Sequence, residues 1–394
     1  MQTQSLQTIQ DLIHIVGKQH VLTDANDTRL YRQGRRYGAG QVLAVVVPGT
    51  LLEQWQVLKV AVNADCIVIM QAANTGLTGG STPFGDDYDR PVILMSTRRL
   101  AGIQVINDGQ QVICLPGATL DRLEKDLVPF NREPHSVIGS SCIGASVLGG
   151  VCNNSGGALV RRGPAYTELA LYARVNESGE LELVNHLGVN LGRTPEEILT
   201  KLENKNYQID DIINNSSCCA SDQHYSHDVK QVDENTPARF NADPSRLFEA
   251  SGSAGKVCVF AVRLDTFEKI PSQVFYVGTN SHDDLTEIRR FLLKDLPRLP
   301  IAGEYIHRVA YDIGAEYGKD SFMFIEKFGT AKVPAAFAMK DKVDGYLEKV
   351  GLRGLSDKVL QLVTKLMPNH LPKRMNEFRD LYEHHLMIRI ENQD

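Results

Sequence analysis

Two glycine-rich segments, residues 71–81 and 136–157, constrain the fold of this chain more than any other feature. Glycine adopts positive φ angles and has no Cβ, so successive backbone N–H groups of such loops can converge on one anion. The Ser, Thr and Asn residues between the glycines add hydroxyl and amide groups that can bind phosphate oxygens. Few acidic residues interrupt either segment. The pair favours a ligand with a long phosphate bridge, and the alternative is that both are ordinary tight loops.

Neither segment matches one of the shorter nucleotide-binding motifs. No Gly-x-Gly-x-x-Gly sequence follows a predicted strand. Residues 252–257 resemble a phosphate loop, but no glycine stands five positions before Gly255 and no Ser or Thr follows Lys256. The sequence therefore excludes the common phosphate-loop and dinucleotide motifs.

Length and composition limit the class of protein. The 394 residues predict two or three domains with large cores. Seven scattered cysteines and the absence of a basic-then-apolar leader indicate a reducing compartment without a disulfide framework. No apolar run is long enough to span a bilayer. The formal net charge of −6 argues against general nucleic-acid binding.

Charge is unevenly distributed along the chain. Residues 327–379 contain eleven basic and five acidic residues, which gives this stretch a net charge of +6. Apolar residues recur there at helical spacing, for example from Val359 to Leu366. Such a basic amphipathic stretch can lie on an anionic membrane surface. The alternative is a pair of ordinary helices with a solvated basic face.

Near-continuous apolar runs predict buried strands over residues 43–48, 66–70, 91–95 and 112–115. Apolar residues with helical period fill the stretch 51–62 between the first two strands. This strand–helix–strand order predicts a small, partly parallel α/β unit. The first glycine segment follows the C-terminal end of the second strand.

Beyond the second glycine segment the pattern changes. Turn residues 176–179 between the apolar runs 169–175 and 181–184 predict a β-hairpin. Thr194 and Pro195 predict the N-cap and the first residue of a helix.

The rest of the chain predicts a loop and a second region. Residues 205–235 are polar without a period and predict a long loop, and 257–264 predict a buried strand. From about Ser272 onward, strand and helix patterns and the apolar run 322–325 predict an α+β cap. The apolar run 385–390 predicts a final strand, whose position so close to Asp394 suggests an absent partner strand.

Two groups of titratable residues are candidates for chemical sites. His224 and His227 lie near Cys218, Cys219 and Asp222, but their spacing is not that of zinc sites, so we expect no metal.

Glu304, His307 and Arg308 form the second group. The Arg could clamp a substrate carboxylate, and the His could accept a proton. A satisfied polar surface is the alternative. No Ser/His/Asp constellation follows from spacing, and the sequence alone identifies no catalytic residue.

The two glycine segments, together with residues 45–50 and 236–244, resemble the FAD-binding domain of the vanillyl-alcohol-oxidase type. More narrowly, residues 132–168 and 249–256 are similar, almost residue for residue, to the bacterial respiratory quinone-dependent D-lactate dehydrogenase family. The resemblance covers essentially the whole chain.

The resemblance implies an α+β protein. An FAD-binding domain of two subdomains would occupy residues 1–268, with the subdomains at 39–135 and 136–268. A partial α+β cap domain would occupy 269–394 and include the basic membrane-binding helical stretch 327–379.

The resemblance also implies non-covalent FAD, whose diphosphate the first segment would wrap, while Val259 would offer its backbone to the adenine end. We expect positive φ at Gly76 in this loop. Carried over residue by residue, the implied FAD-binding residues are Ala72, Ala73, Asn74, Thr75, Gly76, Gly80, Ser81, Gly139, Ser146, Gly156 and Val259.

The implied activity is oxidation of D-lactate to pyruvate, with hydride transfer from C2 to flavin N5 and electrons passed to membrane quinone. The implied location is the cytoplasmic face of the bacterial inner membrane, as a peripheral protein on an anionic surface. A reductase of the same fold that acts on a cell-wall precursor is another reading, against which the long basic cap argues.

The family chains continue well beyond the position of Asp394. The resemblance therefore implies that this chain corresponds to the N-terminal two-thirds of the family, without the substrate-binding and acid/base residues of the last third. A truncated remnant that binds flavin or membrane without turnover is the alternative to an active enzyme.

Overall fold

The computed structural model describes the whole chain except residues 1, 35–36, 136–143, 215–216, 236–243, 330–331, 350, 353, 367–369 and 393–394. The chain forms two compact units, each built from segments that are separated in the sequence. Unit 1 comprises 1–157, 164–223 and 240–269, and unit 2 comprises 158–163, 224–239 and 270–394. The domain boundaries that the resemblance implies, after residues 135 and 268, stay a prediction.

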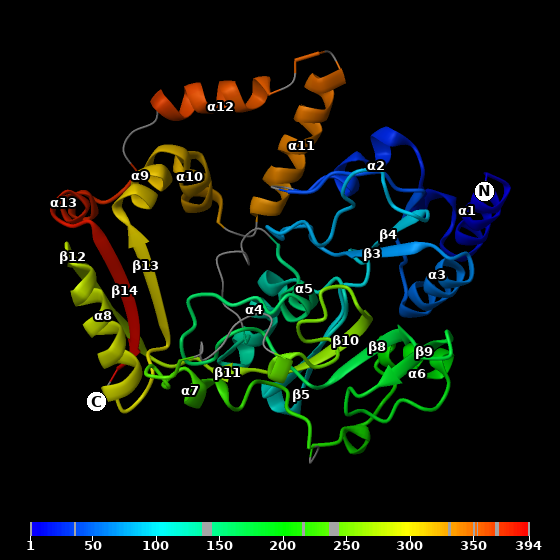
Figure 1. Ribbon diagram of the computed structural model, residues 1–394, viewed down its shortest axis with the longest axis horizontal. Coiled ribbons are helices and arrows are strands. Elements are labelled where there is room, and N and C mark those ends of the chain that lie inside the picture. Colours follow the sequence, from blue (N-terminus) through cyan, green and yellow to red (C-terminus); the bar gives the residue numbers. More distant parts are fainter. Residues whose placement is uncertain are drawn as a thin grey trace. The chain divides into compact units, whose positions relative to one another are not determined.

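Unit 1 contains a four-stranded sheet in the order β1-β2-β4-β3. Strands β3 and β4 of this sheet are labelled in Figure 1. Strands β2, β4 and β3 run parallel, and β1 is antiparallel to β2, which confirms the predicted partly parallel α/β unit. The Thr50 side chain accepts a hydrogen bond from the backbone N–H of Glu53 and so begins the helix between β2 and β3. The elements are α1 (Gln2–Val16), β1 (Val21–Leu22), α2 (Ala25–Arg32), β2 (Ala44–Val46), α3 (Leu51–Asn63), β3 (Ile67–Gln71) and β4 (Val92–Ser96).

A second, five-stranded antiparallel sheet of unit 1 has the order β5-β6-β10-β8-β9. The apolar run 112–115 belongs to this sheet, where β6 pairs with β10. The predicted hairpin is confirmed, because Asn176 Oδ1 accepts from the N–H groups of Ser178 and Glu180, and Gly179 has a φ of 80°. The strands are β5 (Ile103–Ile106), β6 (Gln111–Cys114), β8 (Ala170–Val175), β9 (Leu181–Asn185) and β10 (Cys258–Asp265).

Three helices and a small ribbon complete unit 1. The Thr194 side chain caps α6 and Pro195 is its first residue, as predicted. The described part of the stretch 205–235 contains only single turns of helix, in agreement with the predicted loop. These elements are α4 (Leu120–Leu127), β7 (Arg132–Glu133), α5 (Val147–Cys152), α6 (Pro195–Glu203) and β11 (Phe267–Glu268).

Alternation along the strands divides the core of unit 1 into layers. Val46 and Met95 face one side of the first sheet and join a cluster with Trp55 of α3 and Leu12 of α1. Leu94 faces the other side. One face of the second sheet contributes to the cluster that contains Trp55, and helices α4 and α5 cover its other face. The parallel strands are therefore covered by apolar side chains on both faces.

Unit 2 is built on a three-stranded antiparallel sheet in the order β12-β14-β13. The last strand, β14 (His384–Glu391), lies between β12 (Ser272–Thr279) and β13 (Ala302–His307). The expectation that this strand lacks a partner is therefore wrong, because it pairs along both edges with strands that precede it by many residues.

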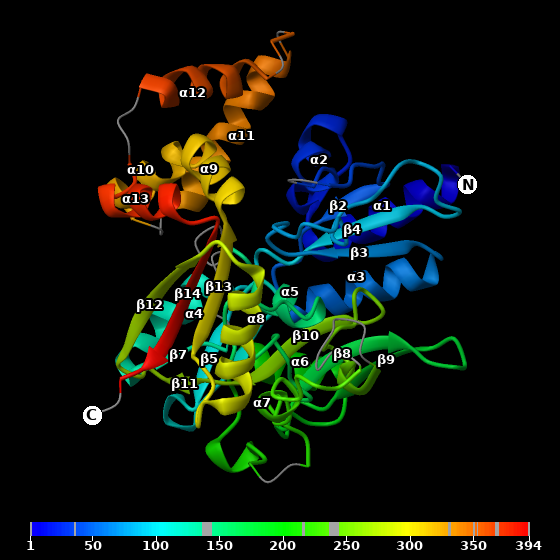
Figure 2. The same cartoon turned by 60° about the vertical axis from the view of Figure 1, so that its left-hand side comes forward.

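Helices make up the remainder of unit 2. Helices α9, α10 and α13 lie together at one end of the sheet, and α11 and α12 lie beyond them (Figure 2). The apolar run 322–325 lies inside α10 and is not a strand. The helices are α7 (Tyr225–Asp228), α8 (His282–Arg290) with a π-helical extension Phe291–Asp295, α9 (Arg308–Tyr317), α10 (Lys319–Phe328), α11 (Val333–Lys349), α12 (Leu355–Leu366) and α13 (Lys373–Leu381).

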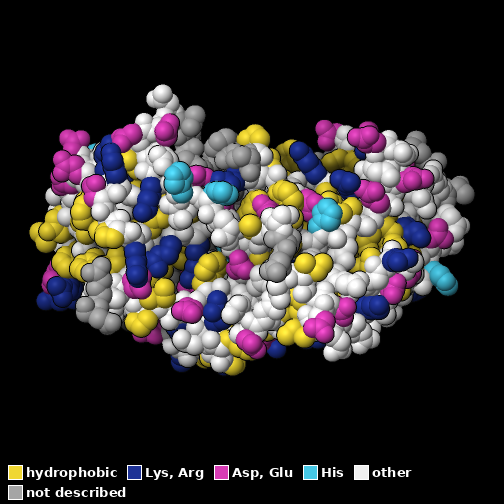
Figure 3. Space-filling model, turned by 90° about the horizontal axis from the view of Figure 1, so that it is seen from below, with side chains coloured by type: hydrophobic (Ala, Val, Ile, Leu, Met, Phe, Trp, Pro, Cys, Tyr) yellow, Lys and Arg dark blue, Asp and Glu magenta, His cyan; other side chains and the backbone are white. Residues whose placement is uncertain are grey.

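No helix in the described part of the chain combines the length and the apolar character needed to cross a bilayer. On the face shown in Figure 3, Lys and Arg side chains lie among Asp and Glu side chains. That face therefore carries charges of both signs, in contrast to the basic excess of residues 327–379.

Candidate cofactor site

The first glycine segment lies at the carboxyl ends of parallel strands. It follows directly from Gln71, the last residue of β3, and the parallel neighbour β4 ends beside it at Ser96. Ligands of open α/β sheets bind outside the carboxyl ends of the strands. The position of the loop is therefore that of a ligand-binding loop.

Side chains at both ends of this loop fix its shape. The buried Gln71 amide donates to the carbonyls of Tyr31 (2.8 Å) and Ser81 (2.7 Å). The buried Asn74 donates to the carbonyl of Gln33 (3.0 Å) and accepts from the hydroxyl of Ser81 (3.0 Å). These bonds close the loop and join it to the segment after α2, so its backbone groups are held in place before any ligand binds.

The backbone N–H groups of this loop are available to a ligand. Among the described residues, no acceptor is found for any N–H group of residues 72–81. A Cβ placed on Gly76 or Gly80 would meet no atom within 4 Å, so the space beside both glycines is open. The segment also contains no carboxylate. This donor set and this open space fit a diphosphate group.

The residues of the loop with left-handed backbone conformation differ from the expected Gly76. Asn74 and Gly79 have φ angles of 55° and 76°, whereas Gly76 is not among the residues with positive φ. The expectation of positive φ at Gly76 is therefore wrong. Gly79 is the position where glycine is required, because a Cβ there would lie 2.7 Å from the Tyr37 ring.

Part of the second glycine segment lies within the described residues. Gly139 falls in the stretch 136–143 and lies outside them. Ser146 is the N-cap of α5, and its hydroxyl accepts from the N–H of Gly149 at 3.2 Å. A Cβ on Gly156 would meet no atom within 4 Å. The structure therefore gives Ser146 a local role in beginning α5 and leaves open space at Gly156.

A short relay of hydrogen bonds connects the two glycine segments. The N–H of Thr97 donates to the carbonyl of Gln71 (2.8 Å), and its hydroxyl donates to the carbonyl of Pro116 (3.1 Å). Two residues further on, the carbonyl of Ala118 accepts from the N–H of Val147 in α5 (2.9 Å). The start of the first loop and the start of α5 are thus joined through Thr97 and the segment 116–118.

Val259 lies near the same strand end. Its carbonyl accepts from the buried Gln54 amide of α3 at 3.2 Å. The preceding Cys258 places its Sγ 3.7 Å from the Sδ of Met70, the residue before the end of β3. Burial raises the pKa of the Cys258 thiol to about 12, so it packs as a neutral group. The predicted FAD contact of Val259 stays a prediction, as do those of the other predicted residues.

The role of Gln71 in closing the loop was not predicted, although the sequence contains a signal for it. A glutamine at the end of an apolar strand is buried only where its amide has partners. Here the partner Tyr31 precedes it by 40 residues. The polar residue at the strand end was visible in the sequence, and its partners were not.

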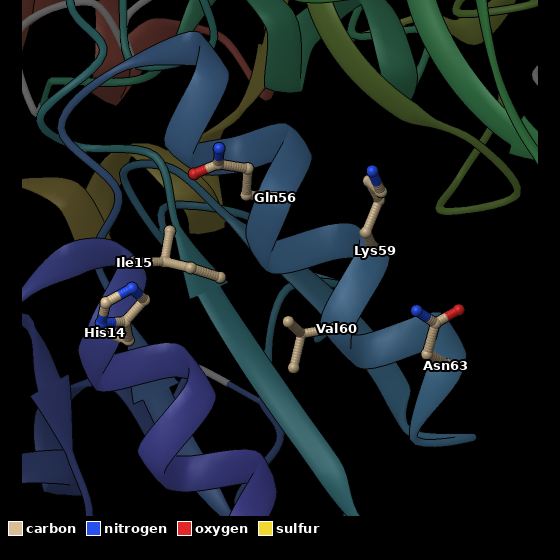
Figure 4. Close-up of a pocket in the computed structure, with 6 residues that line it drawn as sticks. All are labelled: His14, Ile15, Gln56, Lys59, Val60 and Asn63. Carbon is tan, nitrogen blue, oxygen red and sulfur yellow. The ribbon is translucent and has the colours of Figure 1, made fainter.

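A groove of about 420 Å³ lies between α1 and α3 (Figure 4). His14 and Ile15 of α1 face Gln56, Lys59 and Val60 of α3 across it. The last turn of α3 leads into the start of β3, whereas the glycine loop follows the end of β3. No residue of the loop lines the groove, so the groove is separate from the loop site.

The candidate residues of unit 2 lie on strand β13 and at the start of helix α9. His307 caps α9 by accepting from the N–H of Val309, and its Nε2 lies 3.2 Å from Glu383. Glu304 is exposed on β13. No group of three or more His, Cys, Asp or Glu residues in the described structure is arranged to hold a metal ion. His307 thus has the contacts of a satisfied structural residue.

Two family models match the chain. Residues 42–182 match the model described as FAD binding domain, and residues 274–394 match the model described as D-lactate dehydrogenase, membrane binding. The first match includes the loop 72–81 and α5. The second covers the sheet and helices of unit 2 from β12 onward.

Curated relatives are similar over almost the whole chain. The quinone-dependent D-lactate dehydrogenase of Haemophilus influenzae is 58% identical over 388 residues, which cover 98% of this chain and 68% of the relative. That of Escherichia coli is 56% identical over 385 residues, covering 97% and 67%. That of Corynebacterium glutamicum is 47% identical over 392 residues, covering 98% and 68%.

Solved structures show the fold. A p-cresol methylhydroxylase with bound substrate has a TM-score of 0.56 at 12% identity and covers all of this chain and 62% of its own. A 4-ethylphenol oxidase from Gulosibacter chungangensis, in complex with isoeugenol, has a TM-score of 0.53 at 11% identity, with coverage of 99% and 60%. The expected α+β fold of the vanillyl-alcohol-oxidase type is confirmed, and the matched FAD-binding domain supports FAD as the cofactor.

Proposed function

Because this chain belongs to the quinone-dependent D-lactate dehydrogenase family, we propose that it oxidises D-lactate to pyruvate with FAD and passes the electrons to a membrane quinone. The observation that carries this proposal is the loop 72–81, whose backbone N–H groups have no acceptor among the described residues and lie at the carboxyl ends of β3 and β4. FAD, when bound, supplies the electron acceptor for the substrate.

The chain's own contribution at this site is to bind and orient the cofactor. The loop residues 72–76, with Gly80 and Ser81, are proposed to surround the diphosphate, and Gly156 to adjoin it. The hydrogen bonds of Gln71 and Asn74 hold the loop in place before binding. They thereby lower the entropic cost of ordering the loop when FAD binds.

Unit 2 is proposed to hold the protein on an anionic membrane surface at the cytoplasmic face. In α11 and α12, large apolar side chains are exposed, including Met339 (70%), Tyr346 (69%) and Leu362 (64%). Lys342 and Lys358 are exposed on the same two helices. Exposed apolar groups beside cations are the combination that interfacial helices use.

The remnant alternative is less well supported. A chain that only retained the fold would have no reason to stay 58% identical to an enzyme over 98% of its length. The open loop site also keeps its unused donors. We therefore favour an active enzyme.

The test is anaerobic addition of D-lactate to the purified, FAD-loaded chain. We expect the absorbance band of the oxidised flavin to fall with D-lactate and to stay unchanged with L-lactate. Addition of a soluble quinone should then restore the band. A spectrum that D-lactate does not change would support the remnant without turnover.

A further inference from the structure

We propose that Arg98 is a further cofactor-binding residue, whose guanidinium contacts the diphosphate of FAD. The assignment rests on the proposed FAD site in the loop 72–81. It concerns a residue outside both glycine segments, and it adds a cation to a site otherwise made of neutral backbone donors.

Arg98 follows β4 in the same way that the glycine loop follows β3. The two strands are parallel neighbours, with Gln71 opposite Ser96 at their carboxyl ends. Arg98 stands two residues beyond Ser96, and its Nε donates to the carbonyl of Ala72 at 3.3 Å. The side chain is therefore attached to the first residue of the proposed diphosphate loop.

A second contact orients the guanidinium. Its central carbon lies 5.4 Å from the centre of the Tyr31 ring. Tyr31 is also the residue whose carbonyl accepts from Gln71. Arg98 is thus held between the ring and the loop by two contacts that leave its terminal nitrogens unused.

Those terminal nitrogens have no acceptor among the described residues, since the bond from Nε to Ala72 is the one hydrogen bond that this side chain makes there. The neighbouring Arg99 differs, because its Nη1 donates to the carbonyl of Val47 at 2.9 Å and its guanidinium covers Gly49. Arg99 is used by the fold, whereas Arg98 keeps a planar pair of donors at the exposed edge of the loop.

Charge explains why such a residue is useful there. The loop 72–81 offers N–H and hydroxyl groups but no cation. A guanidinium binds phosphate oxygens through two parallel, charge-assisted hydrogen bonds, which are stronger than neutral ones. Arg98 would therefore supply charge neutralisation that the backbone donors lack.

The test is FAD affinity, measured by quenching of flavin fluorescence at two salt concentrations. We expect Arg98→Gln to raise the Kd of FAD about tenfold to a hundredfold. Because a charge is removed, the Kd of the variant should also depend less on salt than that of the unaltered chain. Arg98→Lys, which keeps the charge but not the paired donors, should recover part of the affinity.

Arg122→Gln is the matched control, because Arg122 is an exposed arginine of the same unit with a surface ion pair to Asp126. It should leave the Kd and its salt dependence unchanged. An unchanged Kd in Arg98→Gln would overturn the assignment. So would a raised Kd with the original salt dependence, since that result indicates a purely structural role. An unaltered chain that fails to bind FAD would instead refute the proposed function, and this assignment with it.

Discussion

The hydroxyl of Tyr305 lies 2.8 Å from Nδ1 of His384, in the sheet of unit 2. On the opposite face of the same strand, the hydroxyl of Tyr276 contacts Nδ1 of His385. Both imidazoles are 1% exposed, and neither Nε2 has a partner among the described residues. A tyrosine that donates to Nδ1 places the proton of a neutral ring on Nε2. The fold therefore buries two adjacent histidines, and the surroundings of His385 favour its neutral state.

The structure predicts that unit 2 loses stability in mild acid. Burial is the main cause that lowers the pKa of His385, and the nearby charge of Arg308 adds to it. The unfolded chain binds the proton at about pH 6.5, whereas the folded chain binds it only at lower pH. The contribution of His385 to stability is thus complete above about pH 6.5 and decreases as the pH falls toward the lowered pKa.

The measurement is the urea midpoint of unfolding between pH 7.5 and pH 5, compared with His385→Gln. Glutamine can accept from Tyr276 but does not titrate in this range. We expect a smaller loss of stability on acidification in the variant. Equal pH dependence in both proteins would show that His385 does not control it.

Much of the fold was predictable because its signals are local. Thr194 and Pro195 mark the start of α6 through groups within one turn, and Asn176 and Gly179 mark the hairpin turn in the same way. The parallel strands were recognisable because strands buried on both faces are continuously apolar.

Pairing between distant segments was not predictable from these signals. The run 112–115 pairs with β10, and β14 inserts between β12 and β13, which tertiary packing decides. The apolar run 322–325 has no period that separates strand from helix.

The same limit applies to the candidate site. Its glycines were visible in the sequence, but the closure of the loop by Gln71 depends on Tyr31, a residue of α2. Glycine is needed at position 79 because its φ is positive and the Tyr37 ring approaches closely, and neither property was visible in the sequence.

Gly80 and Gly79 should respond differently to alanine. A Cβ on Gly80 meets open space, so Gly80→Ala should leave thermal stability unchanged but weaken FAD binding by occupying the ligand's space. Gly79→Ala should destabilise the chain by about 1–2 kcal/mol, because the residue has positive φ and its Cβ would approach the Tyr37 ring. Thermal unfolding without cofactor and FAD titration separate the two effects. FAD binding by Gly80→Ala with unaltered affinity would place the cofactor elsewhere.

Gln71→Met should disorder the loop before FAD binds. Methionine keeps the length of the side chain but removes the donors to the carbonyls of Tyr31 and Ser81. Leaving buried acceptors unpaired costs about 1–3 kcal/mol, so we expect a lower melting temperature and weaker FAD binding. Gln56→Met on the exposed face of α3 is the matched control and should change neither property. If both variants behave alike, the closure of the loop by Gln71 has no energetic role.

Membrane attachment should depend on both charge and apolar contact. Lys342, Lys358 and Lys373 are exposed on α11, α12 and α13. Each lysine near an anionic surface is worth about 1 kcal/mol, so replacing all three by glutamine should weaken binding about a hundredfold. Flotation with vesicles of mixed zwitterionic and anionic lipid measures this loss, and added salt should reproduce it in the unaltered chain.

Leu362→Asp on α12 should weaken binding at any salt concentration, because Leu362 is 64% exposed and is proposed to enter the lipid interface. Equal flotation of all variants on zwitterionic and anionic vesicles would contradict an electrostatic contribution from these helices.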